Sequence, residues 1–190
     1  MKATESLEIE HRKIAKVAEA CGVFADELQQ GTPVPVNVLE ALVNFLHLYA
    51  EQCHHQEEKW LFSMLRQRGL PAGTYPMAAL LREDDKLGAL VHQLSNAVGA
   101  YARTKDTLDN TLVDSLHSLA ELYCDHIWKE DYLLLPIADK ILSERDQQAL
   151  VEAFCTIKAN VGQEAYRSLA QFSAAIKSCT LCSDPQEQVA

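Results

Sequence analysis

The chain has 190 residues, of which 48% are hydrophobic and 23% charged, so it is long and apolar enough for a globular core and is not a disordered chain. Its formal net charge of −10 argues against a nucleic-acid or anionic-membrane partner. The N-terminal segment has no apolar signal core and no apolar run approaches a membrane span, so we expect a cytoplasmic protein without a membrane partner.

Five long helices are predicted, because apolar residues recur with a 3.6-residue period and Gly and Pro stand mainly between the periodic segments. In chain order these helices cover about residues 6–31, 37–69, 76–103, 110–142 and 143–176, with Pro136 as a kink in the fourth and Gly162 as a break in the fifth. Four long helices with short connections are typical of a bundle. We therefore predict an all-α fold: an up-down-up-down four-helix bundle with an additional C-terminal helix.

A single helical domain is expected over residues 1–178, with the bundle at about 5–142 and the extra helix at about 143–178. A polar tail follows at residues 179–190. It begins with Cys179 and Cys182, a C-x-x-C pair of the kind found in redox dithiols and in half of a zinc site. Because no second pair stands nearby, an incidental role is the favoured interpretation and a redox role the alternative.

The second predicted helix contains the segment CHHQEEKWLF, in which His54 and Glu58 are four residues apart and share one helix face. The fourth predicted helix repeats this arrangement in HIWKEDYLLLP, with His126 and Glu130. Large apolar residues follow both pairs, which indicates that each helix buries a face nearby. One such pair is weak evidence for a metal site, but two on different helices of one bundle are strong evidence.

Residue counts from the predicted turns place six ionisable side chains at one height in the bundle. His11 lies about 22 residues before the first turn and His54 about 21 after it, and similar counts bring Asp84 level with Glu58 and with the fourth-helix pair. The complete layer is His11, His54, Glu58, Asp84, His126 and Glu130. Such a layer is typical of a dinuclear metal site. The alternative is a solvated set without metal, but burying six ionisable groups without a cation would cost many kcal/mol.

The remaining histidines are expected outside this layer. His47, His92 and His117 are roughly 10 to 13 Å from it along the axis, at 1.5 Å per residue. His55 is rotated about 100° from His54 around the helix. It is therefore expected to face solvent, with a position beside a ligand as the alternative.

These segments resemble the hemerythrin-like, or HHE cation-binding, family. The matching pieces are EIEHRKI, CHHQEEKWLFSML and HIWKEDYLLLPIADKIL, and the resemblance extends over about residues 5–175. It implies a four-helix bundle around a non-haem di-iron centre. It also implies that His11, His54, Glu58, His126 and Glu130 are ligands, with the two glutamates as bridging carboxylates.

The third predicted helix departs from the family pattern, which usually has a histidine there. This chain has REDDKLGALV, so the ligand position falls on Asp84, or on Asp85 if the register slips by one residue. An anionic oxygen in place of a neutral nitrogen adds a negative charge to the site. That charge should favour the ferric state, so reversible O₂ transport is less expected than sensing.

The resemblance implies a di-iron protein that binds or senses O₂, NO or peroxide, with a small diatomic or peroxide ligand as its partner. The alternative is a metal-responsive regulatory module without turnover, with the C-terminal helix as its output surface. The expected cofactor is two iron ions, with manganese or zinc as alternatives, because His and carboxylate ligands suit all three. Whether the protein is an enzyme stays open, as does its oligomeric state, a homodimer included.

Overall fold

The computed structural model describes residues 1–104 and 110–176, and every regular element within these ranges is helical, which confirms the predicted all-α fold. In chain order the elements are α1 Ala3–Gln29, α2 Val36–Phe45, the π-helical η1 Leu46–His54, α3 His55–Gln67, α4 Met77–Thr104, α5 Asn110–Lys129, the π-helical η2 Glu130–Leu134, α6 Leu135–Ile141, α7 Glu144–Val161 and α8 Gln163–Ala175. In these ranges we find no helix that combines the length and the apolar character needed to cross a lipid bilayer. The predicted turn near Thr107 and the pair Cys179 and Cys182 lie outside the described residues.

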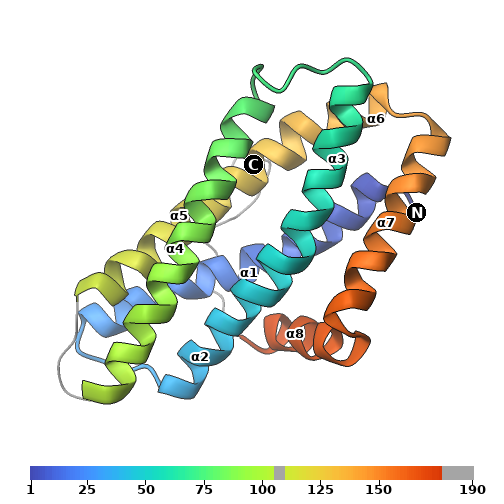
Figure 1. Ribbon diagram of the computed structural model, residues 1–190. Helices are drawn as coiled ribbons and strands as arrows, with labels where there is room; N and C mark the ends of the chain where they lie inside the picture. The colour runs from blue at the N-terminus through green and yellow to red at the C-terminus, as the bar shows by residue number, and fades with distance from the viewer. Residues whose placement is uncertain (105–109, 177–190) are drawn as a thin grey trace, which may run out of the picture.

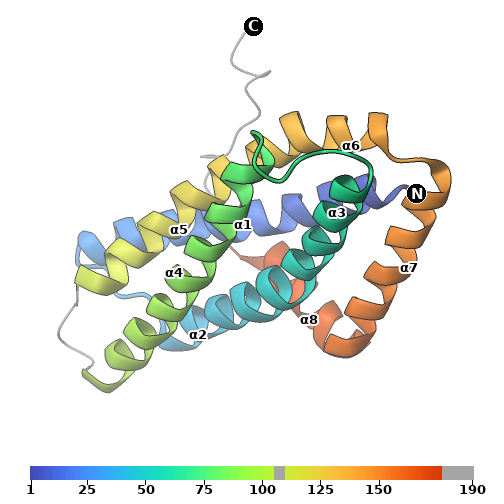
Figure 2. The same ribbon diagram turned by 45° about the horizontal axis from the view of Figure 1, so that its top comes forward.

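Four long helical rods lie side by side (Figures 1 and 2). One rod is α1, the second joins α2, η1 and α3, the third is α4, and the fourth joins α5, η2 and α6. The rod α1 packs along α5, α5 packs along α4, and α4 contacts α2. Outside the rods, α7 contacts α3, η1 and α1, while α8 turns back to contact α1 and α2.

A layer of buried polar side chains divides the apolar core into two parts. Each rod supplies apolar residues to both parts of the core. Along each rod, the polar-layer residues lie between the apolar residues of one part and those of the other. The paired positions are Leu7 and Ile14 on the first rod, Leu61 and Tyr49 on the second, Leu80 and Leu87 on the third, and Leu134 and Tyr123 on the fourth. The side chains of the polar layer are therefore enclosed by apolar residues on both sides.

Two of the predicted helices contain a π-helical segment that the sequence did not indicate. The segment η1 ends at His54, within the predicted helix 37–69, and η2 begins at Glu130. For η2 the cause is Pro136, which stands in the first turn of α6. Proline has no N–H to donate, and its ring clashes with the carbonyl four residues earlier, so the preceding turn widens. π-Helical turns are frequent at functional sites, and both of these end or begin at a predicted ligand.

The C-terminal segment is two helices rather than one. They are separated at Gly162, where a break was predicted and where the backbone has a φ of 92°. Ser143 caps α7, since its hydroxyl oxygen accepts a hydrogen bond from the Asp146 N–H and the Asp146 carboxylate accepts one from the Ser143 N–H. Phe154 of α7 and Leu169 of α8 are buried in the two parts of the core, so both helices belong to the packed body of the protein.

Candidate metal centre

All six sequence-predicted ligands lie in the buried polar layer. None of them is more than 5% exposed: His11, His54, Glu58, Asp84, His126 and Glu130. The first rod provides one of them, the second two, the third one and the fourth two. The structure also distinguishes the two aspartates of the third rod, because Asp84 is 4% exposed while its neighbour Asp85 faces solvent.

Two groups of side chains have ligand atoms close enough to share a cation. In each group, the nitrogen and oxygen atoms lie within 4.8 Å of one another. The first group is His11, His54, Glu58 and Glu130, and the second is His55, Glu58 and Asp84. Glu58 belongs to both groups, so one carboxylate joins them.

His126 lies where the two groups meet. Its Nε2 is 3.4 Å from Asp84 Oδ1 and 3.6 Å from Glu130 Oε2, and it is 3.9 Å from Glu58 Oε1. The same Glu130 oxygen is 3.1 Å from His11 Nε2. The carboxylates of Glu58 and Glu130 are thus surrounded by imidazole nitrogens from three different rods.

Several atoms that point into this centre have no hydrogen-bond partner among the described residues. They are His11 Nε2, Glu58 Oε1, Asp84 Oδ2 and Glu130 Oε2, all inaccessible to solvent. Some of them lie close together without hydrogen-bond geometry, as His11 Nε2 and Glu130 Oε2 do at 3.1 Å. Leaving such atoms unsatisfied costs about 1–3 kcal/mol each, and more for charged groups. A bound cation would remove this cost, so the residues present fit a metal.

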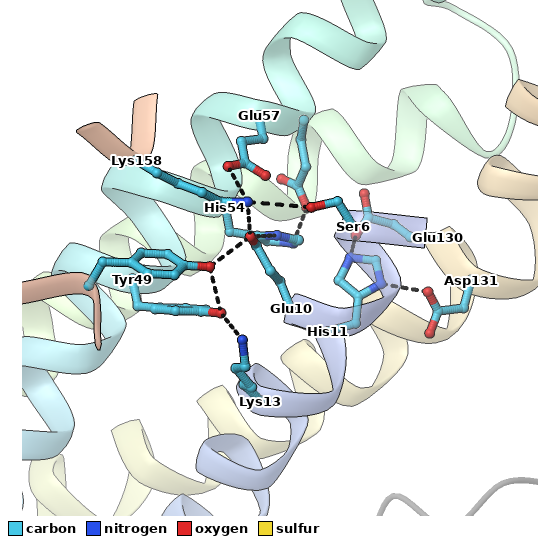
Figure 3. Close-up of polar contacts among 12 residues, drawn as sticks. Ser6, Glu10, His11, Lys13, Tyr49, His54, Glu57, Glu130, Asp131 and Lys158 are labelled. Carbon is cyan, nitrogen blue, oxygen red and sulfur yellow. Dashed lines mark hydrogen bonds and ion pairs between the residues drawn. The ribbon is translucent and has the colours of Figure 1, made fainter. Parts of the chain in front are cut away.

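The other ring nitrogen of each histidine faces a carboxylate from a different rod. The pairs are His11 Nδ1 with Asp131 at 2.5 Å, His54 Nδ1 with Glu10 at 3.2 Å, and His126 Nδ1 with Glu83 at 3.3 Å (the first two are labelled in Figure 3). A carboxylate on Nδ1 fixes the ring orientation and leaves Nε2 for a metal. Each of these carboxylates is next in sequence to a predicted ligand, so one turn of the first, third and fourth rods both supplies a ligand and orients another rod's ligand.

Without a metal, charges within the layer shift the pKa values of its members strongly. Burial alone would lower the pKa of His11, but its contacts with Asp131 and Glu130 outweigh burial and raise that pKa to about 9. Burial and the charge of Glu58 raise the pKa of Glu130. For Glu58 the effect of burial is outweighed by His54 and His126, so its pKa lies well below the usual value. Protons therefore hold the metal-free cluster together, and a metal ion would compete with them.

The sequence analysis missed several members of this layer. The expectation that His55 faces solvent is wrong: its side chain is 19% exposed and its Nε2 lies 3.4 Å from Asp84 Oδ2, the position beside a ligand that was the alternative. The cause is the neighbouring rod α4, which covers the face of the second rod that carries His55. The supporting carboxylates Glu10, Glu83 and Asp131 were missed as well. The signal that could have found them is the recurrence of an acidic residue directly beside five of the six predicted ligands, all except His54.

The other histidines lie outside the layer, as predicted. The side chains of His47 and His117 are 54% and 39% exposed. His92 is exposed and lies within hydrogen-bond distance of Asn96. None of them faces the centre.

A surface groove leads towards the centre. It has a volume of about 570 Å³ and lies between the second rod and α4, with Val43, His47, Glu51 and Gly88 among its lining residues. A much smaller space of about 20 Å³ adjoins the ligands themselves, and Glu51 lines this space too. A Cβ added at Gly88 would lie 3.3 Å from Glu51 Oε1, so α4 passes close to the Glu51 side chain in the lining of the groove.

Comparison with known proteins gives one match. The sequence model of the hemerythrin HHE cation binding domain matches residues 2–138, which confirms the family resemblance over that region; the predicted extension to about residue 175 lies beyond the match. No curated protein and no solved structure matches the chain. The matched region includes α1 to α5, η2 and part of α6, whereas α7 and α8 lie beyond it.

Proposed function

The chain belongs to the hemerythrin HHE cation-binding domain family, and we propose that it is a non-haem di-iron protein that binds or senses O₂, NO or peroxide. We propose further that its rods form an up-down-up-down four-helix bundle and that it works in the cytoplasm. The observation that carries the metal proposal is the set of buried, unpartnered atoms His11 Nε2, Glu58 Oε1, Asp84 Oδ2 and Glu130 Oε2. Imidazole nitrogen and carboxylate oxygen are donors that suit iron.

The proposed ligands support two metal ions rather than one. Glu58 is assigned as one bridging carboxylate because it belongs to both groups of ligand atoms. Glu130 is assigned as the second, because the Nε2 atoms of His11 and His126 lie 3.1 and 3.6 Å from the same Glu130 oxygen. A shared carboxylate is the usual way in which a helical bundle holds two ions close together.

Asp84 is assigned as the ligand from the third rod, in the place where the family usually has a histidine. Asp84 is buried with an oxygen that lacks a hydrogen-bond partner, whereas Asp85 is exposed. His55, which was not expected in the centre, is assigned beside Asp84 because their side chains are 3.4 Å apart. Bound iron would supply exchangeable coordination positions and one-electron chemistry for the small ligand.

The protein's own residues orient the ligands and control access. The carboxylates Glu10, Glu83 and Asp131 each hold a histidine through Nδ1, so the three Nε2 atoms converge. The apolar residues on both sides of the layer keep bulk water out. The groove beside Glu51 is the proposed route for a diatomic ligand or peroxide, and the space of about 20 Å³ next to the ligands is too small for a larger substrate.

A second candidate function is a metal-responsive regulatory module without turnover. One observation favours it: Lys158 of α7 and Tyr166 of α8 both contact Glu10, which faces His54 Nδ1. The metal centre and the placement of the C-terminal helices are therefore linked through one carboxylate. In this function, the C-terminal helices would carry the signal to a partner.

Anaerobic purification, reconstitution with Fe(II) and elemental analysis test the metal proposal. We expect about two iron ions per chain, and a stoichiometry near zero after reconstitution would refute the di-iron centre. The variant His126→Ala removes a proposed ligand and should lose iron. The control His92→Ala changes a histidine outside the centre and should retain it. Rapid mixing of the loaded protein with O₂, NO or peroxide then separates the two functions: a spectral change, with or without turnover, supports a protein that binds or senses these ligands, and no spectral change with any of them supports a metal-responsive module.

A further inference from the structure

A second buried polar cluster lies beside the metal centre, and the C-terminal helices supply its cation. The ammonium of Lys158 on α7 lies 2.6 Å from Glu10 Oε1 and 3.2 Å from Glu57 Oε1 (Figure 3). Glu10 is 1% exposed and Glu57 is not exposed at all. Within the described residues, Lys158 is the cation that lies within 4 Å of both buried carboxylates.

Glu10 connects this cluster to the metal centre because its two oxygens face opposite ways. Oε1 forms an ion pair with Lys158 Nζ and accepts a hydrogen bond from the Tyr166 hydroxyl of α8 at 3.0 Å. Oε2 faces His54 Nδ1 at 3.2 Å. The side chains of α7 and α8 therefore act on His54 through a single carboxylate.

Packing around Tyr166 and Lys158 fixes both side chains. The Tyr166 ring stacks on the Tyr49 ring with their centroids 5.0 Å apart, and the two hydroxyls are 3.2 Å apart. The Lys158 ammonium lies 5.7 Å from the centroid of the Tyr166 ring, within range of a cation–π interaction. These contacts leave Glu10 little freedom to move away from His54.

The part of the chain that matches the family contains the same arrangement once more. Lys129 Nζ lies 2.7 Å from Glu83 Oε1, and Glu83 Oε2 lies 3.3 Å from His126 Nδ1. A lysine thus holds a carboxylate that holds a histidine in both cases. At His126 the lysine comes from the same rod as the histidine, whereas at His54 it comes from α7.

We propose that Lys158 and Tyr166 are positioning residues for the metal centre. They hold Glu10 so that His54 presents Nδ1–H to this carboxylate and directs Nε2 towards the metal. The inference rests on the proposed metal-binding function and extends it to α7 and α8, which lie outside the matched region. The C-terminal helices are then a working part of the centre and not only a cover for it.

The test uses full-length variants. Tyr166→Phe removes the hydroxyl that binds Glu10 with little change of shape, Lys158→Met removes the ammonium, and Lys158→Arg restores a cation. Two controls match them. Tyr75→Phe removes a hydroxyl from an exposed tyrosine outside this cluster, and Lys140→Met removes an exposed ammonium on α6.

The first measurement is the rate at which Fe(II)-loaded protein loses iron to a ferrous chelator under anaerobic conditions. Loss of a residue that supports a ligand typically weakens metal binding about 10–100-fold. We expect Lys158→Met to lose iron at least about 10-fold faster, Tyr166→Phe to lose it several-fold faster, and Lys158→Arg to stay near the wild-type rate. Removal of a positive charge alone would have the opposite effect and tighten cation binding, so the direction of the change tests positioning directly.

The second measurement is the ¹⁵N-histidine NMR spectrum of the Zn(II)-loaded protein. The Nδ1–H resonance of His54 should shift or broaden in Lys158→Met and Tyr166→Phe, while that of His11 should stay in place. Slower or unchanged iron loss together with an unchanged His54 resonance would overturn the inference, whatever happens to the melting temperature. If the wild-type protein binds neither Fe(II) nor Zn(II), the proposed function and this inference are both overturned. If the wild-type protein and the variants bind metal equally well, only this inference is overturned.

Discussion

Removal of the metal should make the protein's stability fall as the pH rises from about 6.5 to 9. The main cause is His11, whose pKa in the folded, metal-free protein is raised from 6.5 to about 9, because its contacts with Asp131 and Glu130 outweigh the opposing effect of burial. A group with a higher pKa in the folded state binds its proton more tightly when folded. Its stabilising contribution is complete below the unfolded pKa and is lost as the pH rises through the folded pKa.

The size of the effect follows from that pKa difference. The change from 6.5 to about 9 corresponds to about 3 kcal/mol, at roughly 1.4 kcal/mol for each pH unit. For a chain of this length, 1 kcal/mol moves the melting temperature by about 2–4 °C, so His11 alone accounts for about 6–12 °C. The pKa values of His54 and His126 are also raised, since nearby carboxylates outweigh burial, and they add to the effect with the same sign.

Other groups limit the stable range on the acid side. The pKa of Glu83 is lowered to about 2 by the hydrogen bond from His126, with Lys129 acting in the same direction against burial. The pKa of Glu10 is also lowered to about 2, because His54 and Lys158 outweigh the effect of burial. Groups with lowered pKa values contribute stability above about pH 4.5, and this stability is lost as the pH falls towards 2. Burial and the charge of Glu10 raise the pKa of Glu57 to about 8, so stability already begins to fall above about pH 4.5, and the metal-free protein should be most stable near pH 4.5.

The assay is thermal unfolding followed by circular dichroism at pH 6, 7, 8 and 9, after chelation and with the metal content verified. His11→Gln should reduce the pH dependence, and His117→Gln, an exposed site, should leave it unchanged. The metal-loaded protein should show a weaker or reversed dependence, because metal ligands must be deprotonated. A melting temperature of the metal-free protein that is constant or rises between pH 6.5 and 9 would refute the reasoning.

Three further predictions address the ligands, the access route and the C-terminal helices. Asp84→Ala should lower the iron content by at least one ion per chain on elemental analysis, whereas Asp85→Ala should keep both ions. Gly88→Val adds a side chain where a Cβ lies only 3.3 Å from Glu51, and it should slow the reaction of loaded protein with NO or peroxide about 10-fold in stopped-flow experiments without changing the iron content. Phe154→Ala should lower the free energy of unfolding by about 3–5 kcal/mol, because a ring that is 2% exposed leaves a cavity. A loss below about 1 kcal/mol in urea unfolding would mean that α7 is not part of the core.

The helical fold and the polar layer could be predicted from the sequence for a simple geometric reason. Residues at equal distances from a turn lie at the same height in antiparallel helices, so counts along the chain brought His11 level with His54. The sequence placed Asp84 in the layer with Asp85 as the alternative, and the structure buries the first and exposes the second. This reasoning needs only distances along helices and rotation around them.

The remaining parts of the centre depend on which rods are neighbours, and the sequence pattern does not contain that information. A rotation of about 100° places His55 away from His54, but only the position of α4 decides whether this direction leads to solvent or to Asp84. The contact between Lys158 and Glu10 joins residues far apart in the chain, at a point where α7 had been expected to lie outside the bundle. The π-helical turns η1 and η2 depend on local backbone hydrogen bonding, which the spacing of apolar residues in the sequence does not predict.

The charges around the centre explain why an aspartate on the third rod matters. Three carboxylates support the histidines from outside, and two of them are paired with an ammonium: Glu10 with Lys158 at 2.6 Å and Glu83 with Lys129 at 2.7 Å. Because these outer charges largely offset one another, the charge that a metal pair experiences is set mainly by the inner carboxylates. A histidine in place of Asp84 would leave two inner negative charges, whereas this chain has three. In the proposed di-iron protein the third charge stabilises Fe(III) relative to Fe(II), since the attraction grows with the charge on the ion. An oxidised resting state fits a protein that senses or reacts with its ligand better than one that must release O₂ unchanged from a ferrous centre.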